Sequence, residues 1–85
     1  MARRQPEKPP ETIPDSFQSP ESSTIVGATY DKDTQTLLVT FTHKNMTYRY
    51  VGVPALVWGA FYQAESRGKF FQQRIRPIWP GTRIE

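Results

Sequence analysis

Few residues in this 85-residue chain could do chemistry. It has no cysteine and one histidine, His43, which lies beside Lys44 in a polar segment typical of a solvated turn. No serine is placed with a base at the kind of strained turn that activates a nucleophile. The segment Asp31–Asp33 begins like a calcium loop, but Thr36 stands where that loop needs glycine, and Thr42 where it needs glutamate. The sequence therefore predicts a non-enzymatic protein with no metal, cofactor or small-molecule substrate.

Positive charge gathers toward the end of the chain, whose net charge is +3. From Ser66 onward the only acidic residue is Glu85. The cations of this region are Arg67, Lys69, Arg74, Arg76 and Arg83. Four polar residues recur there at the spacing of one helix face: Lys69, Gln72, Gln73 and Arg76. Lysine and arginine contact phosphates and glutamine amides bond sugar or base edges, although such a stripe is more often a solvated helix face. Trp79 could stack on a base or fold back onto the helices.

The Tyr48-Arg49-Tyr50 motif is reminiscent of the aromatic platforms on which sheets hold single-stranded RNA. The tyrosines, however, share a sheet face with an apolar set on the neighbouring strand: Leu37, Val39 and Phe41. That face is the best candidate to receive a helix, so we expect both tyrosines to lie largely in the core with their hydroxyls at its rim. The opposite sheet face should then show Leu38, Thr40, Thr42, Thr47, Arg49 and Val51.

A second possible surface is aromatic. Trp58 and Tyr62 lie one turn apart on an expected helix, opposite Leu56 and Ala60. Exposed aromatics at this spacing are typical anchors of protein interfaces. They favour docking on a host protein, as a phage or mobile-element factor would do.

Three regions differ in composition. The first twenty residues hold five of the eight prolines and few large apolar side chains, so residues 1–21 are predicted to form a disordered arm. Residues 22–76 should fold, and residues 77–85 should form a basic tail. No segment resembles a signal peptide or a membrane span, so we expect a cytoplasmic protein.

Within the folded region, alternation predicts three antiparallel strands at about 25–30, 36–42 and 46–51. Turns fall at 31–34 and at 43–45, where Asn45 is the residue best able to adopt a positive φ.

The period changes to that of a helix at Pro54. The predicted buried face of this helix is Val53, Leu56, Val57, Ala60, Phe61 and Ala64. Gly68 should end it in a left-handed conformation, before a second helix at about 69–75. The expected fold class is α+β, a three-stranded antiparallel meander followed by two short helices packed on one sheet face.

These segments together resemble the KTSC domain, a small family named from a C-terminal extension of some lysyl-tRNA synthetases that also occurs as stand-alone bacterial and phage proteins. The resemblance covers residues 22–76, and its hallmark is the central Tyr-x-Tyr. The matching segments are Ser23-Thr24-Ile25, Ala28-Thr29-Tyr30-Asp31, Leu38-Val39-Thr40-Phe41, Tyr48-Arg49-Tyr50, Val53-Pro54, Ser66-Arg67-Gly68-Lys69-Phe70-Phe71 and Arg74-Ile75-Arg76. Asn45-Met46 departs from the family, which usually has a hairpin glycine there, and the proline-rich arm has no counterpart.

The synthetase context of the family implies RNA binding, which agrees with the position of the cations. The sequence thus favours a small RNA- or nucleic-acid-binding module that uses the basic helix and tail. Docking on a host protein through Trp58 and Tyr62 is the alternative. Base specificity, the partner and the oligomeric state stay open.

Overall fold

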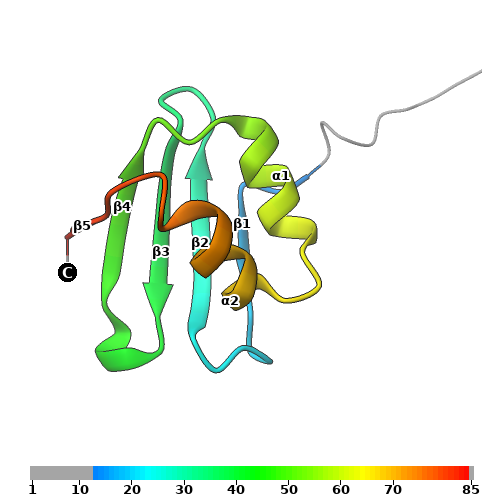
Figure 1. Cartoon of the computed structure of the whole chain (residues 1–85), viewed down its shortest axis with the longest axis vertical. Coiled ribbons are helices and arrows are strands. Elements are labelled where there is room, and N and C mark those ends of the chain that lie inside the picture. Colours follow the sequence, from blue (N-terminus) through cyan, green and yellow to red (C-terminus); the bar gives the residue numbers. More distant parts are fainter. Residues whose placement is uncertain (1–12, 85) are drawn as a thin grey trace, which may run out of the picture.

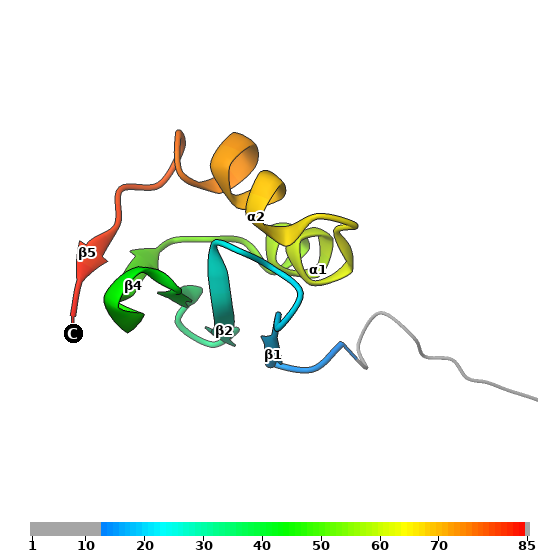
Figure 2. The same cartoon turned by 90° about the horizontal axis from the view of Figure 1, so that it is seen from below.

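The chain forms an α+β fold in which the helices cover one face of a single antiparallel sheet, as Figures 1 and 2 show. The computed structural model describes residues 13–84, so the part of the predicted arm at residues 1–12 lies outside the described residues. The sheet has five strands in sequential order: β1 (Ser16–Gln18), β2 (Ile25–Asp31), β3 (Thr36–Phe41), β4 (Thr47–Val51) and β5 (Thr82–Arg83). The helical segments are the 3₁₀ turn η3 (His43–Asn45), α1 (Ala55–Gln63), α2 (Arg67–Phe70) and the π-helical turn η4 (Phe71–Ile75). Within residues 13–84 no helix has the length and apolar character needed to cross a membrane.

The predicted meander is confirmed as β2, β3 and β4. The first turn closes as expected, because the Asp31 carboxylate accepts a hydrogen bond of 2.9 Å from the Asp33 amide. In the second turn Asn45 has the expected positive φ of 50°, and its neighbour Lys44 also has a positive φ, of 57°. Side-chain capping and left-handed residues therefore set the register of both hairpins.

The core face of the sheet is the one predicted. Leu37 and Val39 are fully buried and Tyr50 is nearly so, whereas Phe41 and Tyr48 are partly buried at one end of the same face. All of them belong to the core, or pack against the core, that contains Phe61, Phe71 and Ile75 of the helical segments.

Strand β2 departs from simple alternation. Simple alternation would place Val26, and not Ile25, on the core face with Ala28 and Tyr30. The register with β3 shifts between Ile25 and Gly27, however, and Ile25 is fully buried while Val26 is exposed. A bulge of this kind inserts one residue and changes which side chains face the core. It allows Ile25 to share the core with Ala28 and Tyr30.

The sheet is wider than predicted because both flanking segments join it. Strand β1 pairs with β2, and the side chain of Phe17 is only 8% exposed. Strand β5 pairs with β4 at the opposite edge, as Figure 1 shows. Part of the predicted arm, Ser16–Gln18, and part of the predicted basic tail, Thr82–Arg83, are therefore strands of the sheet. The prolines did not prevent this, because Pro14 and Pro20 lie outside the strand that they flank.

Helix α1 presents a different face to the core than predicted. Trp58 and Phe61 are buried, whereas Leu56 is 85% exposed and Ala60 is also exposed. An indole ring removes more apolar area from water than a leucine side chain, so burying Trp58 determines the rotation of the helix. Tyr62 is partly buried. The predicted pair of exposed aromatics, Trp58 and Tyr62, is therefore corrected: it belongs to the core.

The helical hairpin also closes differently. Helix α1 ends at Gln63, and the next residue, Ala64, is extended. Helix α2 then begins at a cap formed by Ser66, whose hydroxyl accepts a hydrogen bond of 3.3 Å from the Lys69 amide. Gly68 lies inside α2 and does not have a positive φ, so the prediction that it ends a helix is wrong.

Replacing Phe17 by alanine tests the contribution of β1. Phe17→Ala should lower the free energy of unfolding by about 3–5 kcal/mol, since the ring packs against Trp58, Phe61 and Tyr62. Urea denaturation measures the change. Ser16→Ala, at an exposed position of the same strand, is the control and should change it by less than about 0.5 kcal/mol. Equal stability of the two variants would show that β1 adds nothing to the fold.

A second test concerns a buried hydrogen bond. The Tyr30 hydroxyl donates to the carbonyl oxygen of Val53 over 2.6 Å. Tyr30→Phe should cost about 1–3 kcal/mol of stability, because it leaves that buried carbonyl without its partner. Tyr48→Phe is the matched control, since the Tyr48 hydroxyl makes no hydrogen bond within residues 13–84. A cost for Tyr48→Phe as large as that for Tyr30→Phe would contradict this assignment.

Candidate nucleic-acid interface

The polar side chains predicted on the second helix are held at the surface by its buried residues. Phe71 and Ile75 fix η4 against the sheet. The outward side chains are all exposed, and they are Lys69, Gln72, Gln73, Arg74 and Arg76.

A π-helical turn divides these side chains. The Arg76 amide donates to the carbonyl oxygen of Phe71 over 2.9 Å, five residues back, so the turn is wider than that of an α-helix. The Arg76 guanidinium then reaches back to the side-chain oxygen of Gln72, at 3.2 Å. The side chains of the predicted stripe line two grooves, which are described next. Gln72 and Arg76 together line one of them.

The first of these, the tyrosine groove, lies between the helix and the end of the sheet where the hairpin turns. It has a volume of about 440 Å³. Aromatic and thioether side chains form its apolar part, and polar side chains surround them. It is lined by Ser23, Thr24, Phe41, Thr42, His43, Met46, Tyr48, Tyr50, Gln72 and Arg76.

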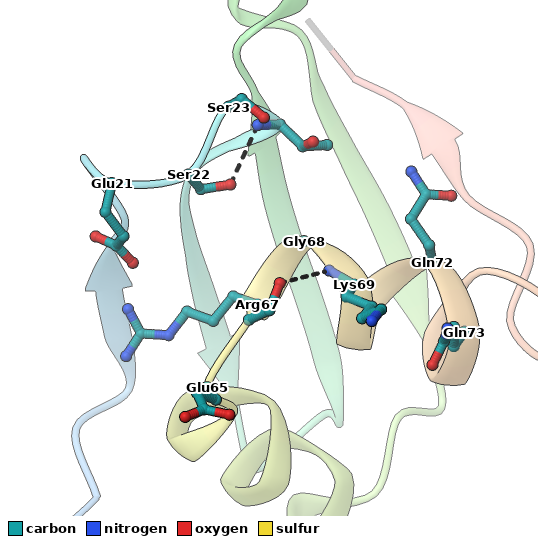
Figure 3. A pocket seen from close by; sticks show the side chains of 11 residues that line it. Glu21, Ser22, Ser23, Glu65, Arg67, Gly68, Lys69, Gln72 and Gln73 are labelled. Carbon is teal, nitrogen blue, oxygen red and sulfur yellow. Dashed lines mark hydrogen bonds between the residues drawn. The ribbon is translucent and has the colours of Figure 1, made fainter.

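The second, the serine groove, adjoins the first on the other side of Gln72. Figure 3 shows it with Lys69 and Gln73 on the helix and Ser22 and Ser23 on the facing loop. Its lining residues are Glu21, Ser22, Ser23, Thr24, Glu65, Ser66, Arg67, Gly68, Lys69, Gln72 and Gln73. The two grooves share Ser23, Thr24 and Gln72 and so adjoin one another, and the pair of grooves is called the depression below.

The wall shared by the grooves is held in place by hydrogen bonds. The Ser22 hydroxyl accepts from the amides of Thr24 and Ile25, at 3.1 and 3.0 Å. The Thr42 hydroxyl donates to the carbonyl oxygen of Ser23 over 2.8 Å. These bonds tie the loop before β2 to the end of β3, so the wall is formed before any ligand binds.

Tyr50 is the most buried residue that lines the tyrosine groove. Burial, with the neighbouring Tyr48 as a smaller cause, raises the pKa of Tyr50 to about 12 in spite of the opposing effect of Arg76. Its hydroxyl is therefore a neutral group that can donate a hydrogen bond. A Cβ atom at Gly81 would lie 2.5 Å from the Tyr50 ring, so the backbone of the C-terminal segment packs directly on that ring.

Arg67 is used inside the fold rather than at the surface of the helix. Its guanidinium lies 4.0 Å from the centroid of the Phe17 ring and donates to the Ser19 hydroxyl over 3.0 Å. It also donates twice to the carbonyl oxygen of Tyr62, at 2.7 and 3.1 Å. Figure 3 shows the side chain pointing toward β1 and away from Gln72. Arg67 therefore joins β1 to both helices.

The remaining predicted residues lie at different places. Arg74 borders a third hollow beside α1, which shares Glu65, Ser66, Lys69 and Gln73 with the serine groove. Trp79 folds back and packs against the core, one of the two alternatives that its sequence position left open. Arg83 is in β5, paired with Tyr48 of β4. The structure thus gathers Lys69, Gln72, Gln73 and Arg76 around the two grooves and leaves these three outside them.

Several groove residues were not among the predicted site residues. Phe41, Met46 and Tyr48 were expected in or beside the core, and Ser23 and His43 were given no binding role. Alternation correctly placed Met46 and Tyr48 on the helix-covered face. It could not show that helical cover stops short of the hairpin, which leaves their side chains partly accessible.

No group of three or more histidine, aspartate or glutamate side chains that could hold a metal ion occurs among residues 13–84.

Comparison with known proteins identifies the family to which this fold belongs. The family model of the KTSC domain matches residues 21–79. The crystal structure of a KTSC domain protein from Yersinia pestis superimposes with a TM-score of 0.73 and 32% sequence identity, covering 82% of this chain and 99% of that one. No curated protein matches significantly. The chain belongs to the KTSC domain family.

Proposed function

We propose that this protein is a non-enzymatic module that binds single-stranded nucleic acid, principally RNA. The strand would bind along the depression formed by the serine and tyrosine grooves. The observation that carries the proposal is the position of Lys69 and Arg76 at the two ends of a path that Gln72 joins in the middle. Cations that can contact phosphates then flank groups that can contact a base.

Charge distribution supports this choice of surface. Among residues 13–84, those lining the tyrosine groove include Arg76 and His43 and no carboxylate. In the serine groove, the carboxylates Glu21 and Glu65 lie on the Arg67 side, away from Gln72, as Figure 3 shows. A polyanion is therefore favoured along the Lys69–Gln72–Arg76 side of the depression and disfavoured beyond it.

Docking on a host protein was proposed from Trp58 and Tyr62. Trp58 is only 4% exposed, so it cannot serve as an exposed anchor in this fold. Nucleic-acid binding is therefore the function that the described surface supports best. Such a partner is available in the cytoplasm, where we propose that the protein acts.

The salt dependence of RNA binding tests the proposal. The Lys69→Gln/Arg76→Gln variant should reduce the slope of log affinity against log salt by about 1.4, from roughly 0.7 per lost phosphate contact on a single strand. Fluorescence anisotropy with a labelled RNA decamer at several salt concentrations measures the slope. The fold should persist, because both side chains are exposed while Phe71 and Ile75 carry the packing.

Arg49→Gln is the matched control. It removes one positive charge from an exposed position on the other face of the sheet, so it should leave the slope nearly unchanged. Equal effects of Arg49→Gln and of either single change on the helix would show that only net charge matters. No measurable binding of the parent protein to RNA at low salt would refute the proposed function.

A further inference from the structure

We propose that the tyrosine groove holds one unstacked base of the bound strand, while Lys69 and Arg76 contact phosphates on either side of it. This inference rests on the proposed function and adds to it a subsite for a nucleobase. It assigns a binding role to Tyr48, Phe41 and Met46, which otherwise count only as edge residues of the core.

The groove has the apolar surface that an unstacked base requires. Phe41 and Tyr48 pack edge to face, with ring centroids 5.7 Å apart, and both rings are only partly buried. Met46 is partly exposed beside them, and a thioether adapts to flat aromatic surfaces. The volume of about 440 Å³ lies near the small end of the roughly 300–1,000 Å³ usual for ligand pockets. One base is therefore a fitting occupant, and a longer apolar segment is not.

Polar groups stand where the edge of such a base would lie. The Gln72 side-chain oxygen accepts from Arg76, which orients the amide and leaves its NH₂ group as a donor. Tyr50 also lines the groove, and its hydroxyl is neutral and can donate a hydrogen bond. His43 at the hairpin supplies a further ring nitrogen. Hydrogen bonds of this kind read base edges in single-stranded RNA.

The connection to the serine groove explains how a strand would continue. Lys69 and Arg76 are seven residues apart, which is about 10 Å along a helix axis. Between them, Gln72 faces Ser23 and Thr24 across the shared part of the depression. A strand following this path would pass one cation before and one after the base in the tyrosine groove. No carboxylate of the described part of the chain lines that groove, which favours this ligand over a cationic or neutral one.

Removing bases while keeping the phosphates separates this subsite from general charge attraction. The parent protein should bind an adenosine pentaribonucleotide about tenfold more tightly than an abasic pentamer of the same charge, because stacking of one base on aromatic side chains is lost. Tyr48→Leu keeps an apolar side chain at the edge of the core but removes the ring, and it should reduce this preference to less than about twofold. Tyr62→Leu is the matched control at a partly buried tyrosine outside the groove, and it should keep the full preference.

The salt slope distinguishes this inference from the function on which it rests. Tyr48→Leu should leave the slope of the parent unchanged. Lys69→Gln, which takes no part in orienting Gln72, should lower the slope by about 0.7 and keep the preference for bases. Salt-dependent binding of both pentamers with equal affinity would overturn the base subsite and leave nucleic-acid binding intact. Failure of the parent to bind either pentamer, or the decamer, would refute both.

A second measurement covers the case in which Tyr48→Leu does not fold. The ¹³C-methyl NMR signal of Met46 in the unmodified protein should shift when the adenosine pentamer is added, because a base in the groove places a ring beside it. The abasic pentamer should shift this signal little at the same saturation. A preference for bases without any shift of the Met46 signal would place the base elsewhere and overturn the subsite.

Discussion

The burial of Trp58 is the constraint on which most of this structure depends. Its indole lies between the rings of Phe17 and Tyr30, with centroid distances of 5.4 Å on each side and interplanar angles of 15° and 9°. Its ring nitrogen donates to the carbonyl oxygen of Pro14 over 3.1 Å. A domain this small has few ways to bury enough apolar area, and one indole placed between two rings contributes a large share. This stack joins β1, β2 and α1.

The position of the second helix follows from that stack. With α1 rotated so that Trp58 is inside, its C-terminal end lies next to Phe17, and Arg67 can bind both Tyr62 and Phe17. Helix α2 begins at that point, and Phe71 then packs edge to face against Phe41 and Tyr50. These contacts set the gap between helix and sheet in which the tyrosine groove lies. The groove is thus a consequence of core packing, since the same rings line it and support the helix.

Sequence patterns predicted the local elements better than their tertiary partners. The two hairpins and the core face of β3 and β4 depend on neighbouring residues, so alternation and turn chemistry were sufficient for them. The rotation of α1 depends on Phe17, more than forty residues away, and periodicity alone favoured Leu56. Similarly, β1 lies between Pro14 and Pro20 and β5 follows Pro80. These short strands form because the edges of the meander accept their backbone hydrogen bonds. Local composition does not report such partners.

In the candidate interface, too, local features were predictable from the sequence and tertiary contacts were not. Exposure of the cations and amides on the second helix was predictable from their spacing around Phe71 and Ile75. The π turn was not, although the contact between Gln72 and Arg76, four residues apart, is one that an ordinary helix also allows. Nor did the pattern distinguish Tyr50, which is 4% exposed, from Tyr48 two residues earlier, which is half-buried. The two tyrosines of the motif therefore have different roles. Tyr50 packs against the helix, and the side chain of Tyr48 is partly exposed to solvent. In a domain with so small a core, binding surface is most readily provided by residues of the second kind, since their side chains contribute to packing and remain accessible to a ligand.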